Sequence, residues 1–564
     1  MKHIETLYQS WLEHATEDQD IINELQAISD SPEQKIDCFY RNLSFGTGGL
    51  RGVIGAGTNR MNIYTVAKAS QGLANYIKNN FPKDKWLVAI SYDSRKKSDL
   101  FAQTAAEVFA ANKLNVYIYS QLMPTPCLSY AVRELNCTAG IMITASHNPS
   151  KYNGYKVYGP DGCQITIQAA NLILSEINRV NIFEGVQKIT FEHGISTRKI
   201  QYITAELERN YIEHVKKESL LTPDNLISKN VSIVYSPLNG TGLKPVLRTL
   251  QESGYTNIQI VKEQELPDGN FPTCPYPNPE VFEAMSLGIE YAKNVEADLL
   301  LATDPDCDRV GVAVKSPDGE YILFSGNETG ILLLDYICAR RIENGTMPEN
   351  PVFIKSIVTT DMAERIAAHY GVTTINVLTG FKYIGEQISI LESKGMLDSY
   401  IFGFEESYGY LSGGYVRDKD AVAGTFLISE MFAYYKTMGI SLLDKLNELY
   451  STYGYTLNTL HSYTYEGPQG VETMQKIMHS FRHGIEQVSG YKVVKCLDYE
   501  LGIEGLPKSN VIKYILEENC SIVIRPSGTE PKMKVYISVC AKDKTTAGDI
   551  EKILVTDIEK YVQL

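Results

Sequence analysis

The sequence predicts an α/β protein, in which three topologically similar α/β domains with mixed or parallel sheets and a C-terminal α+β domain surround a central cleft. Its length of 564 residues suggests about four domains of roughly 150 residues each. Apolar strand-like and helix-like segments alternate in one order three times, and each repeat ends in a polar loop. After about Tyr455 the order becomes mixed, which is typical of an α+β domain.

The first repeat shows the pattern in full. Its strands and helices alternate over 86–92, 99–112, 115–120, 127–134 and 140–144. The last strand, GIMIT, is apolar and stops at the polar loop 145–149. Residues 4, 7 and 11 are apolar at helical spacing, so we also expect a helix at the N-terminus.

The second and third repeats follow the same order without sequence identity to the first. We expect the second over 231–235, 243–253, 257–261, 281–294 and 298–303, and the third over 352–355, 362–370, 372–377, 383–393 and 400–404. Their last strands lead into Asp304–Arg309 and Glu405–Ser407. Alternating strands and helices imply parallel sheets, whose ligands bind at the carboxyl ends of the strands. All three polar loops occupy that position.

The C-terminal part contains the apolar strand SIVI, followed by the loop RPSGTEPK and a final amphipathic helix over 546–563. The predicted domains are 1–205, with the first polar loop, 206–320, with the acidic loop, 321–445, with the Glu405 loop, and 446–564, with the Arg525 loop.

Composition narrows the classes of function. The net charge is −14, which repels nucleic acid and offers no basic stripe for an anionic membrane. The ten cysteines are scattered along the chain and lack the spacing of zinc-binding cysteines, so we expect them to be reduced thiols. There is no signal-peptide pattern, and no apolar run reaches the ~18 residues of a membrane span. We expect a cytoplasmic protein, monomeric or weakly self-associating, that acts on small molecules.

Three aspartates alternate directly after a buried strand, at Asp304, Asp306 and Asp308. Carboxylates this close repel one another unless a cation lies between them, and their hard oxygen ligands favour Mg²⁺. A solvated acidic turn and the start of an EF-hand loop are alternatives. Residues 310–312 continue as a strand rather than as an EF-hand, which favours the magnesium site.

Ser146 lies in a turn after a strand and is followed by His147. In this position its hydroxyl can act as a nucleophile or carry a phosphate. A capping serine is the alternative, and His147 need not be its base because neighbouring loop residues usually point apart. A phosphate on Ser146 would supply the oxygen ligand that three aspartates leave open on a divalent cation.

Two further loops suit an anion. Arg525 and the residues after it combine a guanidinium, two hydroxyls and a glycine turn, which predicts an oxyanion cradle about as strongly as a plain surface turn. The glycine-rich segment 45–52 contains Arg51, which can face a phosphate. It lacks both the P-loop and the Rossmann glycine spacing, so neither ATP nor NAD is indicated.

Glu405 and Ser407 offer a carboxylate and a hydroxyl that match a pair of sugar hydroxyls, although a helix N-cap is the commoner reason for such a pair. Lys382 beside Thr379 and Gly380 is the second candidate for the phosphate cradle. Four basic residues become functional only if the fold brings them to a shared cleft: Lys156, Lys382, Arg417 and Lys419.

Together these motifs resemble the α-D-phosphohexomutase superfamily, and within it the phosphoglucomutase branch, across essentially the whole chain. The segments 144–149, 304–309, 403–407 and 525–529 look like the family's phosphoserine, metal, sugar and phosphate loops, in the family's order. This resemblance implies an isomerase-class phosphotransferase that interconverts α-D-glucose 1-phosphate and glucose 6-phosphate through glucose 1,6-bisphosphate.

The resemblance also implies roles for individual residues. Ser146 carries the phosphoryl group and binds Mg²⁺ with the three aspartates, while Glu405 and Ser407 hold sugar hydroxyls. The distal phosphate is held by Arg525, Ser527, Gly528 and Thr529, and the transferring phosphate lies near Arg51, Lys156, Arg309 and Lys419. Lys156 is the first candidate for the general base, on the expectation that neighbouring cations lower its pKa, and Lys419 or His147 would act on the return step.

One departure concerns the sugar. Phe404 stands where family members often pass directly from glycine to glutamate, and the long N-terminal lead is similar to a branch that contains phosphopentomutases. Phosphomannomutase and phosphopentomutase activity therefore stay open as alternatives. So do a catalytically silent sugar-phosphate sensor and a phosphatase in which water attacks the phosphoserine.

Overall fold

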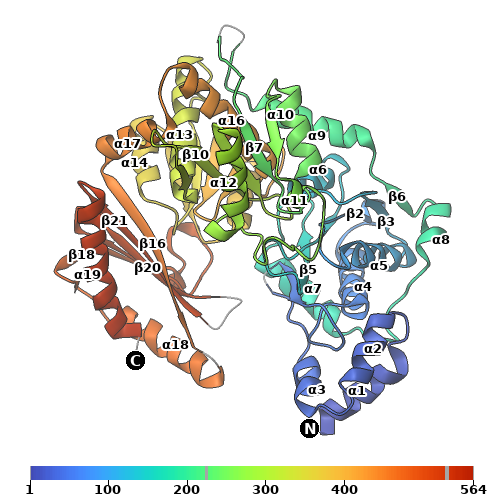
Figure 1. Cartoon of the computed structure of the whole chain (residues 1–564). Coiled ribbons are helices and arrows are strands. Elements are labelled where there is room, and N and C mark those ends of the chain that lie inside the picture. Colours follow the sequence, from blue (N-terminus) through green and yellow to red (C-terminus); the bar gives the residue numbers. More distant parts are fainter. Residues whose placement is uncertain (1, 47, 223–225, 466, 528–531, 563–564) are drawn as a thin grey trace.

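A computed structural model describes residues 2–46, 48–222, 226–465, 467–527 and 532–562. It contains four β-sheets, and we call the parts of the chain around them domains 1 to 4. The chain runs from the N-terminal helices at the lower right of Figure 1, over the top of the molecule, to domain 4 at the lower left. The first and last domains therefore lie on opposite sides of the molecule, as a central cleft requires.

Three helices precede domain 1: α1 (Lys2–His14), α2 (Gln19–Ala27) and α3 (Pro32–Phe39). The predicted N-terminal helix is confirmed, and its Trp11 is buried. The Trp11 ring lies 5.5 Å from the ring of Tyr64 and 5.7 Å from that of Phe39, both edge-on. Such aromatic contacts bury a large apolar area, and they fix the helices to domain 1.

Domain 1 is a six-stranded mixed sheet in the order β1-β5-β4-β2-β3-β6. Its strands are β1 (Gly49–Val53), β2 (Leu87–Tyr92), β3 (Asn115–Ile118), β4 (Ala139–Ile143), β5 (Tyr152–Tyr158) and β6 (Ile200–Tyr202). The accompanying helices are α4 (Ile63–Asn80), α5 (Ser98–Ala111), α6 (Thr125–Glu134), α7 (Ile167–Asn178), α8 (Phe191–Ser196) and α9 (Ala205–Lys217).

Domain 2 has the strand order β11-β10-β9-β7-β8. Its elements are β7 (Ile233–Ser236), α10 (Leu243–Glu252), β8 (Ile258–Ile260), α11 (Lys262–Glu265), α12 (Phe282–Val295), β9 (Leu299–Thr303), β10 (Val310–Lys315) and β11 (Tyr321–Phe324). Domain 3 has the order β13-β12-β14-β15. Its elements are α13 (Gly326–Glu343), β12 (Val352–Ser356), α14 (Met362–His369), β13 (Thr373–Val377), α15 (Phe381–Ser393), β14 (Tyr400–Glu405), β15 (Gly409–Leu411), α16 (Ala421–Thr437) and α17 (Leu442–Tyr453).

The three repeats share one topology. In each, the first strand pairs in parallel with the second on one side and with the third on the other, and the third then pairs with an antiparallel return strand. Each return loop contains a non-glycine residue with a left-handed backbone, namely Ser146 (φ 51°), Cys307 (φ 52°) and Tyr408 (φ 65°). Such residues cost free energy and tend to cluster at functional sites. The three loops predicted from the sequence are thus equivalent positions of one repeated unit.

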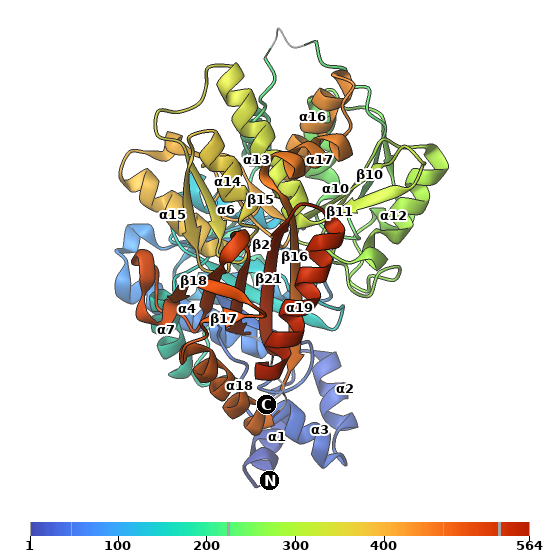
Figure 2. The same ribbon diagram turned by 90° about the vertical axis from the view of Figure 1, so that its left-hand side faces the viewer.

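Domain 4 is antiparallel throughout, in the order β16-β21-β20-β19-β18-β17. Its elements are β16 (Tyr455–Thr464), α18 (Gly467–Arg482), β17 (Gln487–Val488), β18 (Tyr491–Asp498), β19 (Ile512–Leu516), β20 (Ser521–Pro526), β21 (Lys532–Ala541) and α19 (Lys544–Val562). Figure 2 shows the sheet with α18 and α19 beside it. Its main hydrophobic core is its own, formed between residues 474 and 562.

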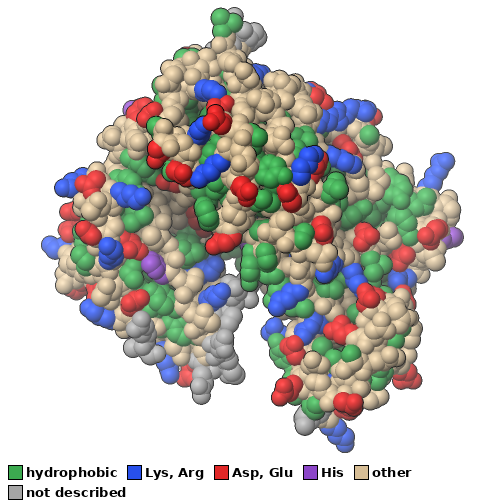
Figure 3. All heavy atoms as spheres, in the orientation of Figure 1, with side chains coloured by type: hydrophobic (Ala, Val, Ile, Leu, Met, Phe, Trp, Pro, Cys, Tyr) green, Lys and Arg blue, Asp and Glu red, His purple; other side chains and the backbone are tan. Residues whose placement is uncertain are grey.

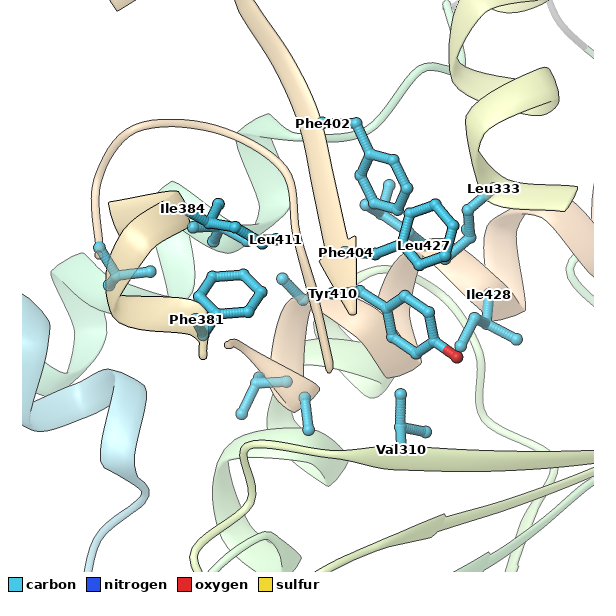
Figure 4. Close-up of a cluster of buried hydrophobic side chains, with 14 of the residues drawn as sticks. Val310, Leu333, Phe381, Ile384, Phe402, Phe404, Tyr410, Leu411, Leu427 and Ile428 are labelled. Carbon is cyan, nitrogen blue, oxygen red and sulfur yellow. The ribbon is translucent and has the colours of Figure 1, made fainter. Parts of the chain in front are cut away.

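The other domains share a core. One cluster of buried apolar residues extends through domains 1, 2 and 3 and includes several residues of domain 4. Figure 4 shows part of it, where Val310 of domain 2 lies near Phe404, Tyr410 and Ile428 of domain 3. Strand β11 (Tyr321–Phe324) belongs to the second sheet, and α17 (Leu442–Tyr453) spans residue 445. The predicted domain bounds stay predictions.

Candidate active site

A cavity of about 570 Å³ lies where the four domains meet. Figure 3 shows the molecular surface hollowed between domain 4 and the N-terminal part. The cavity brings together twelve of the residues predicted from the sequence, from every domain: Arg51, Ser146, His147, Lys156, Asp308, Arg309, Thr379, Gly380, Glu405, Ser407, Lys419 and Arg525. A shared cleft, the condition for Lys156 and Lys419 to be functional, is therefore met.

Ser146 lies in the return loop between β4 and β5. Its backbone N–H donates to Thr144 Oγ1 at 2.8 Å, and its hydroxyl donates to Asp304 Oδ2 at 2.8 Å. The guanidinium of Arg95 is buried behind the loop and donates to the carbonyl of Ser146, from Nε at 3.2 Å, and to that of Pro149 at 3.0 Å. Arg95 thus fixes the backbone of the loop, and the Ser146 hydroxyl faces the acidic residues of domain 2.

The three aspartates after β9 form a compact, buried group. One carboxylate oxygen from each of Asp304, Asp306 and Asp308 lies within 4.8 Å of the others. Oδ1 of both Asp306 and Asp308 is buried without a hydrogen-bond partner among the described residues. Burial, together with the charges of its two neighbours, raises the pKa of Asp304 well above its usual range. Unpaired buried carboxylate oxygens fit a hard divalent cation, which would satisfy them and offset the repulsion.

Two lysines reach this group from other domains. Lys156 Nζ, on β5, donates to Asp306 Oδ2 at 2.8 Å and lies 3.8 Å from Asp308 Oδ2. Lys419 Nζ lies 3.0 Å from the same Asp308 oxygen. Burial opposes the charge of Lys419, but Asp308 and Asp418 outweigh it and hold the Lys419 pKa above its usual value. Lys156 is therefore paired with carboxylates, and the cation Lys419 approaches the same Asp308 oxygen.

His147 and Arg51 line the side of the cavity nearest Ser146. His147 Nδ1 lies 3.2 Å from Ser146 Oγ. Burial, with the charges of Arg309 and Arg51, lowers the His147 pKa well below its usual value, so the imidazole is neutral at neutral pH. Arg51 Nη1 donates to Asn148 Oδ1 at 3.3 Å. A neutral ring beside a hydroxyl can accept its proton.

Arg309 projects into the cavity from domain 2. It forms an ion pair with Glu280, and its Nε lies 3.7 Å from Asp308 Oδ1. Burial disfavours its charge, but Glu280 and Asp308 raise its pKa above the usual value. Arg309 is therefore a firmly held cation on the cavity wall.

The loop after β14 presents Glu405, Glu406 and Ser407 at the cavity. Glu405 Oε1 accepts a hydrogen bond from the backbone N–H of Gly380 at 2.7 Å. Gly380 has a φ of 121°, a conformation that favours glycine. Burial and the neighbouring Glu406 raise the Glu405 pKa to about 7. Thr379 Oγ1 is buried at the cavity without a hydrogen-bond partner among the described residues, which leaves it available to a polar ligand.

Arg525 extends from β20 of domain 4 into the cavity. Its Nη2 donates to Tyr536 OH at 3.0 Å, and the guanidinium lies 5.6 Å from the centre of the Tyr536 ring. Ser527 lies at the end of β20, where its N–H donates to the carbonyl of Lys532 at 2.7 Å. The predicted ligands Gly528 and Thr529 lie outside the described residues.

Three of the predicted substrate ligands that the structure describes are not among the cavity-lining residues: Arg417, Lys382 and Ser527. Arg417 is completely buried and donates to Glu392 Oε2 at 2.8 Å and to the carbonyl of Val416 at 3.0 Å. Its expected role in substrate binding is therefore corrected to a structural one. Lys382 lies 5.1 Å from the centre of the Tyr383 ring and is not among the cavity-lining residues. Sequence position cannot distinguish a buried arginine from a cavity arginine, because burial depends on which helix packs over it.

The sequence analysis missed residues that support the predicted ones. Arg95 follows β2, and Thr125, which donates to Asp306 Oδ2 at 3.0 Å, follows β3. Arg95 comes shortly after β2 at the carboxyl edge of the first sheet, so the rule that found Ser146 could have found it, whereas Thr125 is the first residue of α6 and is not marked by a strand end. Glu280 precedes α12 in a proline-rich loop and carries no such signal.

None of the helices formed by the described residues combines the length and hydropathy needed to cross a lipid bilayer. Three family models match in order. They are the phosphoglucomutase/phosphomannomutase α/β/α domains I, II and III, over residues 42–182, 209–319 and 325–453.

Comparison with known proteins extends this match to most of the chain. Phosphoglucomutases of Staphylococcus saprophyticus and Staphylococcus aureus are each 37% identical to it, over 94% of this chain and 96% and 95% of theirs. A Paramecium phosphoglucomutase structure has a TM-score of 0.68 at 17% identity, covering 93% of this chain and 96% of its own. A Burkholderia thailandensis phosphoglucomutase/phosphomannomutase family protein has a TM-score of 0.67 at 16% identity, covering 92% and 97%.

The structural likeness confirms the predicted fold, and the sequence relatives confirm the predicted class of enzyme, an isomerase-class phosphohexomutase acting on sugar phosphates. The chain belongs to the phosphoglucomutase/phosphomannomutase family of the α-D-phosphohexomutase superfamily.

Proposed function

We propose that this chain interconverts α-D-glucose 1-phosphate and glucose 6-phosphate, with Ser146 as phosphate carrier and glucose 1,6-bisphosphate as intermediate and activator. The observation that carries the proposal is the 2.8 Å hydrogen bond from Ser146 Oγ to Asp304. It joins a nucleophilic hydroxyl to a buried acidic triad at a cavity lined by all four domains. The two phosphoglucomutases that share 37% identity support glucose as the sugar.

The acidic triad would hold magnesium through Asp304, Asp306 and Asp308, with a phosphate on Ser146 as a further oxygen ligand. When bound, the ion supplies positive charge that stabilises the transferring phosphoryl group. Arg51, Arg309 and Lys419 line the same wall and add cationic charge from the chain itself. Phosphoryl transfer depends mainly on alignment and charge neutralisation, and this wall provides both.

Proton transfer needs one group that accepts a proton and one group that donates a proton. His147 is neutral and lies 3.2 Å from Ser146 Oγ, so we assign it the serine proton. Lys156 and Lys419 are ion-paired cations, which suits binding the phosphoryl group and donating a proton to the leaving oxygen. Lys156 remains our candidate for the base that takes the sugar hydroxyl proton, a role that requires its ammonium group to lose a proton first, after the incoming substrate displaces its ion pair with Asp306.

The opposite end of the cavity would hold the phosphate that does not react. Arg525 lines the cavity from domain 4 and would bind this phosphate, and Glu405, Ser407 and Thr379, which line it from domain 3, would contact sugar hydroxyls. After the first transfer the bisphosphate must turn around, so that each phosphate occupies each end in turn. The same phosphate-binding residues then hold the non-reacting phosphate of both substrates.

Turnover on purified protein tests the proposal. We expect interconversion of glucose 1-phosphate and glucose 6-phosphate that depends on Mg²⁺ and is stimulated by glucose 1,6-bisphosphate. Intact mass and peptide mapping should find one phosphate on Ser146. Full activity of unphosphorylated protein without added bisphosphate would refute the carrier.

Turnover measured on a panel of sugar 1-phosphates determines which sugar the enzyme prefers. Phosphomannomutase or phosphopentomutase activity is the alternative, and higher kcat/KM for mannose or ribose 1-phosphate than for glucose 1-phosphate would select it. Release of inorganic phosphate without isomerisation would identify a phosphatase, and binding without turnover would identify a sensor. The cytoplasmic location and the monomeric or weakly associating state remain predictions.

A further inference from the structure

An ion-pair cluster joins domain 3 to domain 4 beside the cavity. Asp361, directly before α14, accepts hydrogen bonds from Lys513 Nζ on β19 and from Ser521 Oγ on β20, both at 2.7 Å. Lys513 also donates to the carbonyl of Ile357 at 3.2 Å. One carboxylate of domain 3 therefore holds two strands of domain 4.

The cluster is largely buried. The side chains of Lys513 and Asp361 are 7% and 21% exposed, and Lys355, 3.2 Å from the same Asp361 oxygen, is completely buried. Burial opposes the charge of Asp361, but Lys513 and Lys355 outweigh it and hold the Asp361 pKa below its usual value. Removing one partner of such a pair leaves an uncompensated buried charge, which is strongly unfavourable. The contact is thus a strong constraint on how the two domains meet.

Strand β20 connects this cluster to the active site. Ser521 and Arg525 both belong to β20, and both line the cavity. Residues four apart on a strand share a face and lie about 13 Å from each other. Asp361 therefore fixes one end of the strand whose other end presents Arg525, our candidate for the phosphate cradle.

Helix α14 makes a second contact with domain 4 one turn later. Arg365 Nε donates to the carbonyl of Tyr453 at 3.1 Å, and its Nη2 donates to Thr456 Oγ1 on β16 at 2.9 Å. Figure 1 shows α14 at the end of the domain 4 sheet nearest domain 3. The start of α14 is thus attached to three strands of the domain 4 sheet, β16, β19 and β20.

We propose that Asp361 is a positioning residue whose pairing with Lys513 and Ser521 holds domain 4 over the bound sugar phosphate. This inference rests on the proposed function for its kinetic consequences. A firmly placed domain 4 keeps Arg525 within reach of the non-reacting phosphate, and it retains the bisphosphate while that intermediate turns around. A loosened domain 4 releases the bisphosphate before the second transfer.

The test compares Asp361→Asn and Lys513→Met with Glu364→Gln in the full-length enzyme. Glu364 is the matched control because it pairs with Lys355 at 3.0 Å and accepts a hydrogen bond from Asn376, both within domain 3, and among the described residues it forms no ion pair with domain 4. For both test variants we expect the KM for glucose 1-phosphate and the glucose 1,6-bisphosphate needed for half-maximal activity to rise about tenfold, because small misplacements of binding groups carry large costs. Lys513→Arg, which keeps the charge, should stay close to wild type, as should the control.

Small-angle X-ray scattering gives a readout independent of catalysis. Asp361→Asn and Lys513→Met should have larger radii of gyration than the wild type and the Glu364→Gln control. Lys513→Met tests the contact from domain 4 if Asp361→Asn does not fold. Unchanged KM, bisphosphate demand and scattering would overturn the proposal, and so would equal defects in Glu364→Gln. If the wild type has no mutase activity, the proposed function fails, and scattering alone decides the role of Asp361.

Discussion

Ser146 Oγ lies 2.8 Å from Asp304 Oδ2, although the two residues are 158 positions apart and belong to different domains. Each lies at the carboxyl end of the third strand of its own repeat, and the two repeats face each other. The chemistry of the site therefore depends on an interface between two copies of one fold. Substitutions on either side of this contact should affect the same step.

Substitution of the carrier hydroxyl is the first test of this interface. Ser146→Ala should abolish phosphate incorporation and nearly all mutase activity, while the melting temperature changes little because one loop hydroxyl contributes little to stability. Ser150→Ala, in the same loop, is the control. Mass spectrometry after incubation with glucose 1,6-bisphosphate checks the result, and a phosphorylated, active Ser146→Ala protein would contradict it.

Metal binding should be visible without any activity measurement. Because a cation binds only the folded triad, Mg²⁺ should raise the melting temperature of chelator-treated protein. Asp306→Ala should lose both this shift and the activity, because it removes one of three clustered carboxylates. Differential scanning calorimetry with and without Mg²⁺ provides the measurement. A metal-free enzyme that works at full rate would refute the metal site.

Arg95 should matter for both stability and rate. Its guanidinium is buried and donates hydrogen bonds to several carbonyls of the Ser146 loop. The ammonium group of lysine cannot reproduce this planar arrangement of donors. We expect Arg95→Lys to lower the free energy of unfolding by about 1–3 kcal/mol and to reduce kcat. Urea unfolding and steady-state kinetics check this, with exposed Arg179→Lys as control. Wild-type stability and kcat together would show that the loop does not need Arg95.

Glu405 should give the protein a specific dependence of stability on pH. Its pKa is raised to about 7 in the folded state from 4.5. The folded state disfavours ionisation of this carboxyl. The protonated Glu405 side chain therefore contributes fully to the free energy of unfolding below pH 4.5, and this contribution is lost as the pH rises to 7. The loss is on the order of 3 kcal/mol.

Glu405→Gln removes the ionisation, so its stability relative to wild type should increase between pH 4.5 and 7 and then level off. Urea unfolding at several pH values measures this difference, with exposed Glu206→Gln as control. Parallel curves for wild type and Glu405→Gln would show that the carboxyl titrates in its ordinary range.

Arg525 and Glu405 should separate phosphate binding from sugar recognition. Arg525→Ala should weaken both glucose 1-phosphate and glucose 6-phosphate by about tenfold to a hundredfold, because a charge-assisted contact is lost. Glu405→Ala should mainly change the ratio of kcat/KM for glucose and mannose 1-phosphate. If Arg525→Ala alters that ratio while both phosphates bind normally, the cradle lies elsewhere.

The repeated topology and the positions of the functional loops could be predicted from local patterns in the sequence. Alternating apolar segments identify strands and helices because burial requires that periodicity, and the polar loops after GIMIT, DLLLAT and YIFGF stand out against apolar strands. The structure has β4, β9 and β14 there. Ser146, Asp304 and Glu405 could be found in this way because strand ends carry local signals.

Which polar residues reach the cavity, and which residues they pair with, depends on how distant segments pack together. Arg417 lies in the loop between β15 and α16 and Arg525 lies near the end of β20, but the first is completely buried and the second lines the cavity. Lys156 forms an ion pair with Asp306, which is 150 positions away in the sequence. Burial and electrostatic partners arise from segments far apart in the chain, such as Asp361 and Lys513, which are 152 positions apart, and no local pattern in the sequence records which segments meet.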